Sequence, residues 1–263
     1  MMKKCALHSL GCKVNSYETQ AMQKMMESAG YEIVPFGEEI ADIYIINTCS
    51  VTNIADRKSR QMIHKAKKLN PEAVVAAAGC YVESAGDNID EDVDIVIGNN
   101  EKSHLIEILR EYFEHMDKEK SVDIGKVTSF DELNIDSPLE HTRAYVKIQD
   151  GCNRFCSYCI IPYVRGRIRS RKPDDVMEEI KRIADSGCKE VVLTGIHLSS
   201  YGLDFKDSTV KLIDVIEAVN KIEGIERIRL GSLEPLIVTE EFVTRLSKCD
   251  KICPHFHLSL QSG

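Results

Sequence analysis

The chain of 263 residues lacks any run of about 18 consecutive apolar residues, the length that a membrane-spanning helix requires. It also lacks the apolar stretch that a secretory signal peptide carries, because polar residues resume soon after the opening Met-Met-Lys-Lys-Cys-Ala. Its hydrophobic content of 43% is nevertheless ample for one large or two medium-sized domains. These features predict a globular, cytoplasmic protein with no membrane partner.

Cysteine, by contrast, is abundant: the chain contains ten. A reducing compartment disfavours a disulfide framework, so this number favours metal or redox chemistry. Three cysteines, Cys152, Cys156 and Cys159, follow a C-x3-C-x2-C spacing. Three thiolates on one loop can bind three irons of a cubane iron–sulfur cluster and leave the fourth iron free to bind and reduce a ligand. A zinc site is the alternative, but structural zinc favours paired knuckles and no second knuckle lies nearby in the sequence.

The first half of the chain alternates between short apolar runs and helical patterns, which is typical of a mostly parallel, doubly wound α/β sheet. Asn15, with Glu18 three residues later, has the spacing of a helix N-cap and its capping box. The predicted strands are residues 3–12, 31–34, 41–49, 73–80 and 94–98, and the predicted helices are residues 15–29, 52–69 and 102–116.

Three further cysteines, Cys12, Cys49 and Cys80, each follow one of these predicted strands. The carboxyl ends of parallel strands share one edge of a sheet, where ligands of open α/β sheets bind. The three thiols are therefore expected to lie together and could hold a second cluster. Three ordinary buried cysteines are the alternative, because cysteine is often found in cores.

The second half begins after a charged segment with little apolar periodicity. We expect a first domain over residues 1–120, a linker over 121–140 and a second domain over 141–263. The C-x3-C-x2-C loop follows the first strand of the second domain, as active-site loops do in β/α barrels. Four strands are half of such a barrel, so we expect its N-terminal part only, in a chain that looks truncated. The predicted strands are residues 143–149, 190–194, 227–231 and 255–260, and the helices are residues 172–187, 208–222 and 239–248.

The cysteine segments resemble those of the radical S-adenosylmethionine (SAM) methylthiotransferases. Tyr158 fills the aromatic position before the last cysteine of the radical SAM motif, and residues 149–166, QDGCNRFCSYCIIPYVRG, are similar to the methylthiotransferase branch. LGCKVN at residues 10–15, NTCSVT at 47–52 and GC at 79–80 resemble the three cysteine motifs of that branch's N-terminal domain. The resemblance implies two [4Fe–4S] clusters, an auxiliary one for sulfur insertion at Cys12, Cys49 and Cys80, and one that binds SAM at Cys152, Cys156 and Cys159.

In this family the SAM-bound cluster generates a 5′-deoxyadenosyl radical, so no side chain is expected as a general acid or base. Small residues and a carboxylate at strand ends suit SAM binding. The SAM candidates are Thr194, Gly195, Ser232 and Glu234, with Tyr158 either near the adenine or shielding the metal. The other four cysteines match no motif and are predicted to be core or surface thiols: Cys5, Cys188, Cys249 and Cys253.

A net excess of positive charge is also missing, since 34 Lys and Arg face 42 Asp and Glu for a formal charge of −8. RNA phosphates would therefore have to meet local basic segments. Arg165 and Arg167 are the substrate-binding candidates, in an alternating run that continues through Arg169 and Arg171 and would form one cationic face of an extended segment. Contact with the SAM carboxylate is the alternative for these arginines. The basic helix predicted at 52–69 is the second segment, although such charge runs usually form a solvated face.

The amino-acid sequences of residues 47–61, 195–202 and 230–235 are most similar to the corresponding segments of the enzymes that act on N6-threonylcarbamoyladenosine (t6A). The resemblance implies methylthiolation at C2 of t6A at position 37 of tRNA, an electron donor such as flavodoxin or ferredoxin, and a monomer or weak dimer. Family members continue into further barrel strands and an RNA-binding TRAM domain. The alternatives are an isopentenyl-adenosine tRNA or ribosomal protein S12 as substrate, or a two-cluster electron carrier or redox sensor.

Overall fold

The computed structural model describes residues 2–115, 124–136, 142–206 and 209–261. Parts of the expected linker, residues 121–123 and 137–140, and the expected start of the second domain at 141 lie outside this range. The chain forms two compact units. The first comprises Met1–Val127, Asp131–Leu133 and Arg154–Gly166, and the second comprises Thr128–Phe130, Asn134–Asn153 and Arg167–Gly263.

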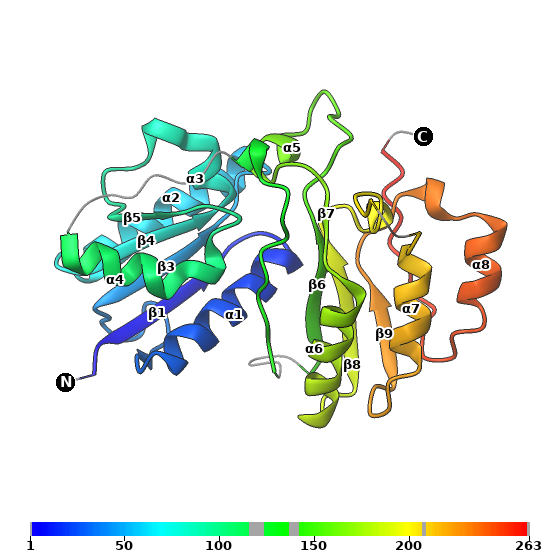
Figure 1. The fold of residues 1–263 in the computed structure, drawn as a ribbon. Helices are drawn as coiled ribbons and strands as arrows, with labels where there is room; N and C mark the ends of the chain where they lie inside the picture. Colours follow the sequence, from blue (N-terminus) through cyan, green and yellow to red (C-terminus); the bar gives the residue numbers. More distant parts are fainter. Residues whose placement is uncertain (1, 116–123, 137–141, 207–208, 262–263) are drawn as a thin grey trace. The chain divides into compact units, whose positions relative to one another are not determined.

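The first unit is built on a parallel five-stranded sheet in the order β2-β1-β3-β4-β5 (Figure 1). This is the 2-1-3-4-5 order of doubly wound sheets, in which the strand order reverses between β1 and β3 and a ligand crevice forms there. The strands are β1 (Lys4–Ser9), β2 (Glu32–Ile33), β3 (Ile43–Thr48), β4 (Val74–Gly79) and β5 (Ile95–Ile97), and the helices are α1 (Lys13–Ser28), α2 (Asn53–Leu69), α3 (Cys80–Ala85), α4 (Leu105–His115) and α5 (Ile161–Val164).

Two hydrophobic cores cover the two faces of this sheet. Ile43 and Ile45 of β3 pack with residues of α1 and α4 on one face, and Tyr44 and Ile46 pack with residues of α2 and α3 on the other. Every residue of β3 is buried, because successive side chains point to opposite, equally covered faces. The predicted doubly wound sheet is confirmed.

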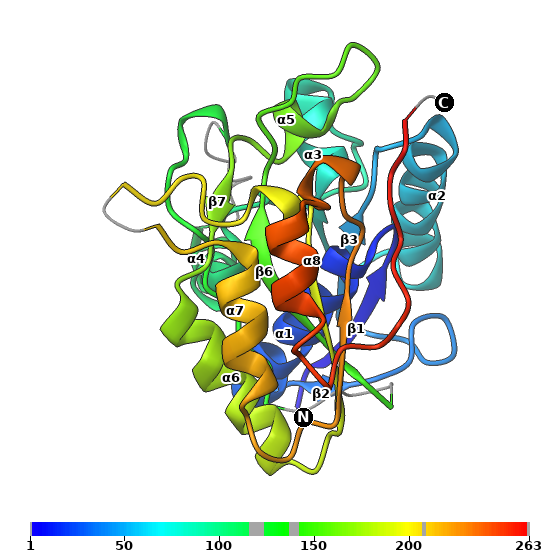
Figure 2. The same ribbon diagram turned by 90° about the vertical axis from the view of Figure 1, so that its right-hand side faces the viewer.

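The second unit contains a four-stranded sheet in the order β7-β6-β8-β9. β6, β8 and β9 are parallel, and the two-residue β7, too short to be recognised from the sequence, is antiparallel to β6. Figure 2 shows α6, α7 and α8 as neighbours over one face of the sheet. The elements are β6 (Ala144–Asp150), β7 (Arg169–Ser170), α6 (Pro173–Asp185), β8 (Glu190–Gly195), α7 (Leu212–Asn220), β9 (Arg227–Leu230) and α8 (Glu240–Leu246).

The strand predicted at residues 255–260 is wrong in this structure. A single bridge from Leu258 to Leu233 stands in its place. Phe256, Leu258 and Leu260 are all exposed, so the alternating apolar side chains have no core face to cover. In the described part of the chain, no helix combines the length and apolarity that crossing a bilayer takes.

Candidate functional site

Cys12, Cys49 and Cys80 come together at the carboxyl edge of the first sheet. They follow β1, β3 and β4, which are neighbouring strands flanking the reversal of strand order. Burial raises the pKa of the Cys49 thiol, and the nearby thiols of Cys80 and Cys12 raise it further. The fold therefore brings these three cysteines together at one edge of the sheet, as the sequence predicted.

Two glycines allow the cysteine loops to approach one another. Gly11 has φ +100°, and a Cβ there would lie 2.8 Å from Cys49 Sγ. Gly79 has φ +96°, and its Cβ would lie 2.5 Å from the carbonyl oxygen of Thr48. Any side chain at either position would push a cysteine-bearing loop away from the edge.

The local structure at Asn15 differs from the prediction of a helix cap. α1 begins at Lys13, with Cys12 as its N-cap residue, so Asn15 lies inside the first turn. The buried Asn15 amide instead donates to the carbonyls of Leu10 (2.7 Å) and Thr48 (2.8 Å). It thereby joins the loop after β1 to the end of β3, and its Oδ1 lies 3.9 Å from Cys12 Sγ.

Arg165 is fully buried in the first unit, beside the same cysteines. Its Nη1 lies 2.7 Å from Glu18 Oε1, its Nη2 lies 2.5 Å from Asn15 Oδ1, and its Nε lies 3.4 Å from Cys80 Sγ. Lys102 contacts the other oxygen of Glu18 at 2.5 Å. Arg165, predicted to bind substrate RNA, is therefore paired within the first unit and does not present its guanidinium to solvent.

Glu18 and Lys102 were not identified as site residues from the sequence. Glu18 has the spacing of a capping-box acid, yet it lies on the buried face of α1 between Tyr17 and Ala21. A charged residue on an apolar helical face is the signal that could have identified it, since a fully buried charge needs a partner.

The C-x3-C-x2-C loop leaves β6 through Gly151, which has φ +68°. Cys152 is buried and belongs to the second unit, whereas Cys156 and Cys159 belong to the first unit and share one turn, in which the Cys159 amide donates to the Cys156 carbonyl at 2.9 Å. Phe155 adopts φ +48°, a left-handed conformation that costs a non-glycine residue about 1–2 kcal/mol. Backbone strain of this kind is concentrated at ligand-binding and active sites.

The SAM candidates of the second unit lie at the carboxyl ends of β8 and β9. Thr194 is buried, and a Cβ on Gly195 would lie 2.9 Å from the Gln149 side chain, so only glycine fits there. Glu234 pairs with His197, with 3.3 Å between Oε2 and Nε2. The backbone amide of His197 donates to Gln149 Oε1 at 2.7 Å, which ties the end of β8 to the end of β6.

The remaining two SAM candidates are exposed. Ser232 Oγ lies 2.7 Å from His257 Nδ1. Tyr158 belongs to the first unit and is 75% exposed, and its side chain contacts the Cys156 thiol of the same turn.

The arginine run does not form one cationic face. Arg167 is exposed, whereas Arg169 and Arg171 are buried. Arg171 pairs with Glu179 and also donates to Asn134 at 2.7 Å. The prediction of an alternating basic surface is wrong because the side chains of Arg169 and Arg171 are buried and only Arg167 is exposed.

Arg169 is different, because Nε and Nη2 have no hydrogen-bond partner among the described residues. Its Nη1 donates to the Arg167 carbonyl at 2.9 Å, and its Nη2 lies 3.8 Å from Asp150 Oδ2. Asp150 is already paired with Lys147 at 2.7 Å. A buried guanidinium with open donors is suited to binding an anionic group.

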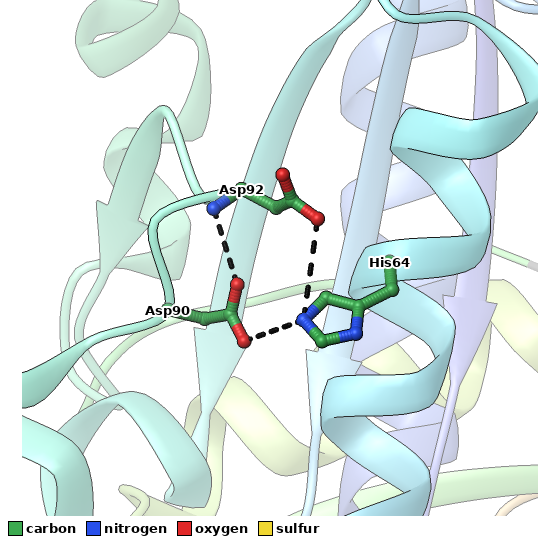
Figure 3. A group of neighbouring side chains, drawn as sticks. All are labelled: His64, Asp90 and Asp92. Carbon is green, nitrogen blue, oxygen red and sulfur yellow. Dashed lines mark hydrogen bonds and ion pairs between the residues drawn. The ribbon is translucent and has the colours of Figure 1, made fainter.

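One group of metal-ligating atoms in the described ranges lies within 4.8 Å of one another: His64, Asp90 and Asp92 (Figure 3). His64 Nε2 lies 2.7 Å from Asp90 Oδ2, and the backbone amide of Asp92 donates to the other Asp90 oxygen. These groups satisfy one another at the surface, with His64 58% exposed.

The four cysteines outside the motifs are buried. Cys5 has no exposed surface, and burial raises the pKa of its thiol to about 12. The other three, Cys188, Cys249 and Cys253, are also buried. Of the two environments predicted for these thiols, core or surface, the structure shows the core.

Comparison with known proteins places this geometry in a family. Residues 4–98 match the family described as uncharacterized protein family UPF0004, and residues 146–263 match the radical SAM superfamily. The second half of the chain is therefore a radical SAM region, preceded by a region of the UPF0004 type. Its curated relatives include tRNA methylthiotransferases, which confirms the resemblance inferred from the cysteine motifs.

Two relatives are named threonylcarbamoyladenosine tRNA methylthiotransferase MtaB. The Bacillus subtilis protein is 42% identical over 266 residues, and the Aquifex aeolicus protein is 43% identical over 265. The tRNA-2-methylthio-N(6)-dimethylallyladenosine synthase of Moorella thermoacetica is 37% identical over 264 residues. These matches include 100%, 99% and 96% of this chain but 58%, 63% and 58% of the relatives, so the chain spans about three fifths of their length.

Solved structures show the same fold. TsrM from Kitasatospora setae, a radical SAM methyltransferase, aligns with a TM-score of 0.67 and 12% identity when bound to tryptophan and a SAM analogue, covering 98% of this chain and 59% of TsrM. Its structure with cobalamin and a [4Fe–4S] cluster aligns with a TM-score of 0.65 and 13% identity, covering 99% and 59%. The predicted α/β architecture, a doubly wound sheet followed by radical SAM strands, is confirmed.

Proposed function

We propose that the protein is a radical SAM enzyme that methylthiolates C2 of t6A at position 37 of tRNA. The observation that carries this proposal is the gathering of Cys12, Cys49 and Cys80 at one sheet edge in a chain that also carries the C-x3-C-x2-C loop. A two-cluster electron carrier would account for the cysteines but not for the small residues at the ends of β8 and β9, which leave room for SAM. The 42% and 43% identity to proteins named for this reaction supports the choice of substrate.

The residues present fit two [4Fe–4S] clusters, one held by each cysteine trio. Each trio offers three soft thiolates and leaves one iron without a protein ligand. When bound, the clusters and SAM supply the radical and the sulfur chemistry, and the protein supplies placement and exclusion of water. The proposed ligands are Cys12, Cys49 and Cys80 in residues 1–120, and Cys152, Cys156 and Cys159 at the start of the second domain, residues 141–263, after the linker 121–140.

In the second unit, the ends of β6, β8 and β9 form the proposed SAM site. Gly195 has no side chain, so SAM can approach the protein backbone there. Thr194, Ser232 and Glu234 offer polar groups to the ribose and ammonium of SAM. Tyr158 is the proposed aromatic contact. The open donors of the buried Arg169 suit the SAM carboxylate, which would satisfy them with a charge-assisted pair.

The substrate side of the proposal rests on exposed cations. Arg167 is exposed and follows the cluster loop in the sequence, and α2 presents Arg57 and Lys58 to solvent directly after the Cys49 loop. Either can contact phosphates locally despite the negative total charge. We further propose a cytoplasmic enzyme, monomeric or weakly dimeric, that receives electrons from a flavodoxin or ferredoxin.

The test is anaerobic reconstitution of the full-length protein with iron and sulfide, followed by reaction with SAM, dithionite and tRNA containing t6A. Mass spectrometry of the digested tRNA should show 2-methylthio-t6A, together with 5′-deoxyadenosine. Product on isopentenyl-adenosine tRNA alone would reassign the substrate. Loaded clusters without any SAM cleavage would favour an electron carrier.

A further inference from the structure

We propose that Arg165 is a positioning residue of the auxiliary cluster, which sets the reduction potential of that cluster through a charge-assisted hydrogen bond to the Cys80 sulfur. This inference rests on the proposed function, because it concerns the cluster assigned to Cys12, Cys49 and Cys80. It gives a role to a buried cation that is not itself a ligand of either proposed cluster.

The orientation of the guanidinium is determined on every side. Glu18 binds it in a forked arrangement, with Nη1 2.7 Å from Oε1 and Nη2 3.3 Å from Oε2, and Asn15 Oδ1 accepts from Nη2 at 2.5 Å. The remaining Nε points to Cys80 Sγ at 3.4 Å. Because the fork is planar and rigid, these contacts direct one N–H at the sulfur.

Charge neutralisation of Glu18 does not by itself explain why Arg165 is buried beside the cysteines. Lys102 contacts Glu18 Oε2 at 2.5 Å and is itself fully buried, so the carboxylate has a cation without Arg165. Lys102 also contacts Asn99 Oδ1 at 2.9 Å, and Asn99 Nδ2 lies 3.9 Å from Cys80 Sγ. Arg165 thus meets the sulfur directly, whereas Lys102 meets it through Asn99.

The second connection is through the chain. Arg165 is the penultimate residue of the segment Arg154–Gly166, which carries Cys156 and Cys159 and packs within the first unit. Asn99 Nδ2 also donates to the Val164 carbonyl at 2.6 Å. The segment that carries two ligands of the proposed SAM cluster is therefore anchored beside the auxiliary cysteines.

The physical consequence concerns the electron affinity of the cluster. Hydrogen bonds to cluster sulfurs and nearby charge are the means by which a protein sets an iron–sulfur potential. A cation bonded to Cys80 stabilises the reduced, more negative state more than the oxidised one. Removing it should therefore make the midpoint potential more negative.

The experiment uses full-length protein in which Cys152, Cys156 and Cys159 are replaced by Ala, so that iron binds at the auxiliary site alone. Arg165→Met, Arg165→Lys and Lys102→Met are each added to this background. Redox titration followed by electron paramagnetic resonance gives the midpoint potential, and iron analysis gives the loading.

We expect Arg165→Met to lower the ratio of reduced to oxidised cluster at a given potential at least tenfold, about 59 mV for a one-electron couple. Arg165→Lys, which keeps the charge, should lie between Met and Arg. Lys102→Met should shift the ratio less than Arg165→Met. Iron loading rescued by Lys but lost with Met would also support the proposal.

Equal potentials in the three Arg165 forms would overturn the proposal, as would equal shifts in Arg165→Met and Lys102→Met. Loss of iron from both Arg165 variants would overturn it too, because it would indicate a role in folding alone. Failure of the cysteine-replaced parent itself to bind iron would instead refute the proposed auxiliary cluster. The two failures are therefore distinguishable.

Discussion

Arg165 and Glu18 are 147 residues apart in the sequence, and their side chains form a forked ion pair with no exposed surface. The pair joins the segment that follows the C-x3-C-x2-C loop to the helix that follows Cys12. It makes the surroundings of the first cysteine trio a composite of two distant parts of the chain.

Loss of the buried carboxylate should destabilise the first unit. Glu18→Gln leaves Arg165 and Lys102 without their shared anion, and breaking a buried pair costs about 3–5 kcal/mol. Chemical denaturation of the protein followed by circular dichroism measures this change. Glu27→Gln, an exposed position on the same helix, is the control, and equal effects of the two substitutions would contradict the prediction.

Gly79→Ala should destabilise the first unit and lower its iron loading. The new Cβ would lie 2.5 Å from the Thr48 carbonyl oxygen, and the backbone of Gly79 has φ +96° and ψ −159°, a conformation essentially restricted to glycine that costs another residue about 1–3 kcal/mol. Gly30→Ala is a matched control, because Gly30 has φ +88° but nothing lies within 4 Å of its Cβ position. Thermal unfolding and iron analysis of both variants test the difference; a Gly30 variant as damaged as the Gly79 variant would refute it.

Glu190 makes the second unit sensitive to acid. Burial alone would raise its pKa, but hydrogen bonds from Arg227, Arg229 and Arg143 outweigh burial and lower the pKa from 4.5 to about 2. A lowered carboxyl pKa stabilises the fold above the unfolded pKa, and this contribution is lost as pH falls from 4.5 towards 2.

Glu190→Gln should therefore reduce stability at neutral pH and flatten its decline between pH 4.5 and 2. Denaturant unfolding of the protein at several pH values measures this slope. Glu226→Gln, at an exposed neighbouring carboxylate, should leave the slope almost unchanged. An unaltered decline in the Glu190 variant would mean that other groups carry the acid sensitivity.

Arg169→Ala should weaken SAM binding at least tenfold in the cluster-loaded enzyme, because two buried donors lose the anion proposed to satisfy them. Arg169→Lys should recover part of the affinity by keeping the charge. Equilibrium dialysis with labelled SAM gives the Kd. Arg182→Ala, on the partly exposed side of α6, is the control, and wild-type affinity in Arg169→Ala would remove this residue from the site.

Arg167→Ala should weaken tRNA binding and reduce the slope of log affinity against log salt concentration by about one, as expected for one lost phosphate contact. Fluorescence anisotropy with labelled tRNA at several salt concentrations measures both. Lys248→Ala removes an exposed cation after α8 and serves as the control. Unchanged affinity at low salt would exclude Arg167 from the RNA contact.

Much of this protein was determined by local sequence. The apolar runs, helix patterns and glycines predicted the doubly wound sheet and the places where Cys12, Cys49 and Cys80 follow its strands, because strand order and sheet edge follow from short-range patterning. The C-x3-C-x2-C spacing of Cys152, Cys156 and Cys159 was likewise recognisable from the sequence alone. Apart from the strand expected at residues 255–260, the differences from the prediction concern polar residues: Asn15 and Glu18 had the spacing of a cap, and Arg165 and Arg169 that of a basic surface.

Only the tertiary structure decided what those polar side chains do. A buried charge needs a partner of opposite charge, which determines its role. The partners of Arg165, Arg171 and Asp150 depend on which segments the fold brings together. The same holds for residues 255–260, whose alternating pattern forms a strand only where a neighbour and a core face are present. Local patterning therefore determined the edge on which the cysteines lie, and long-range packing determined the charges that surround them.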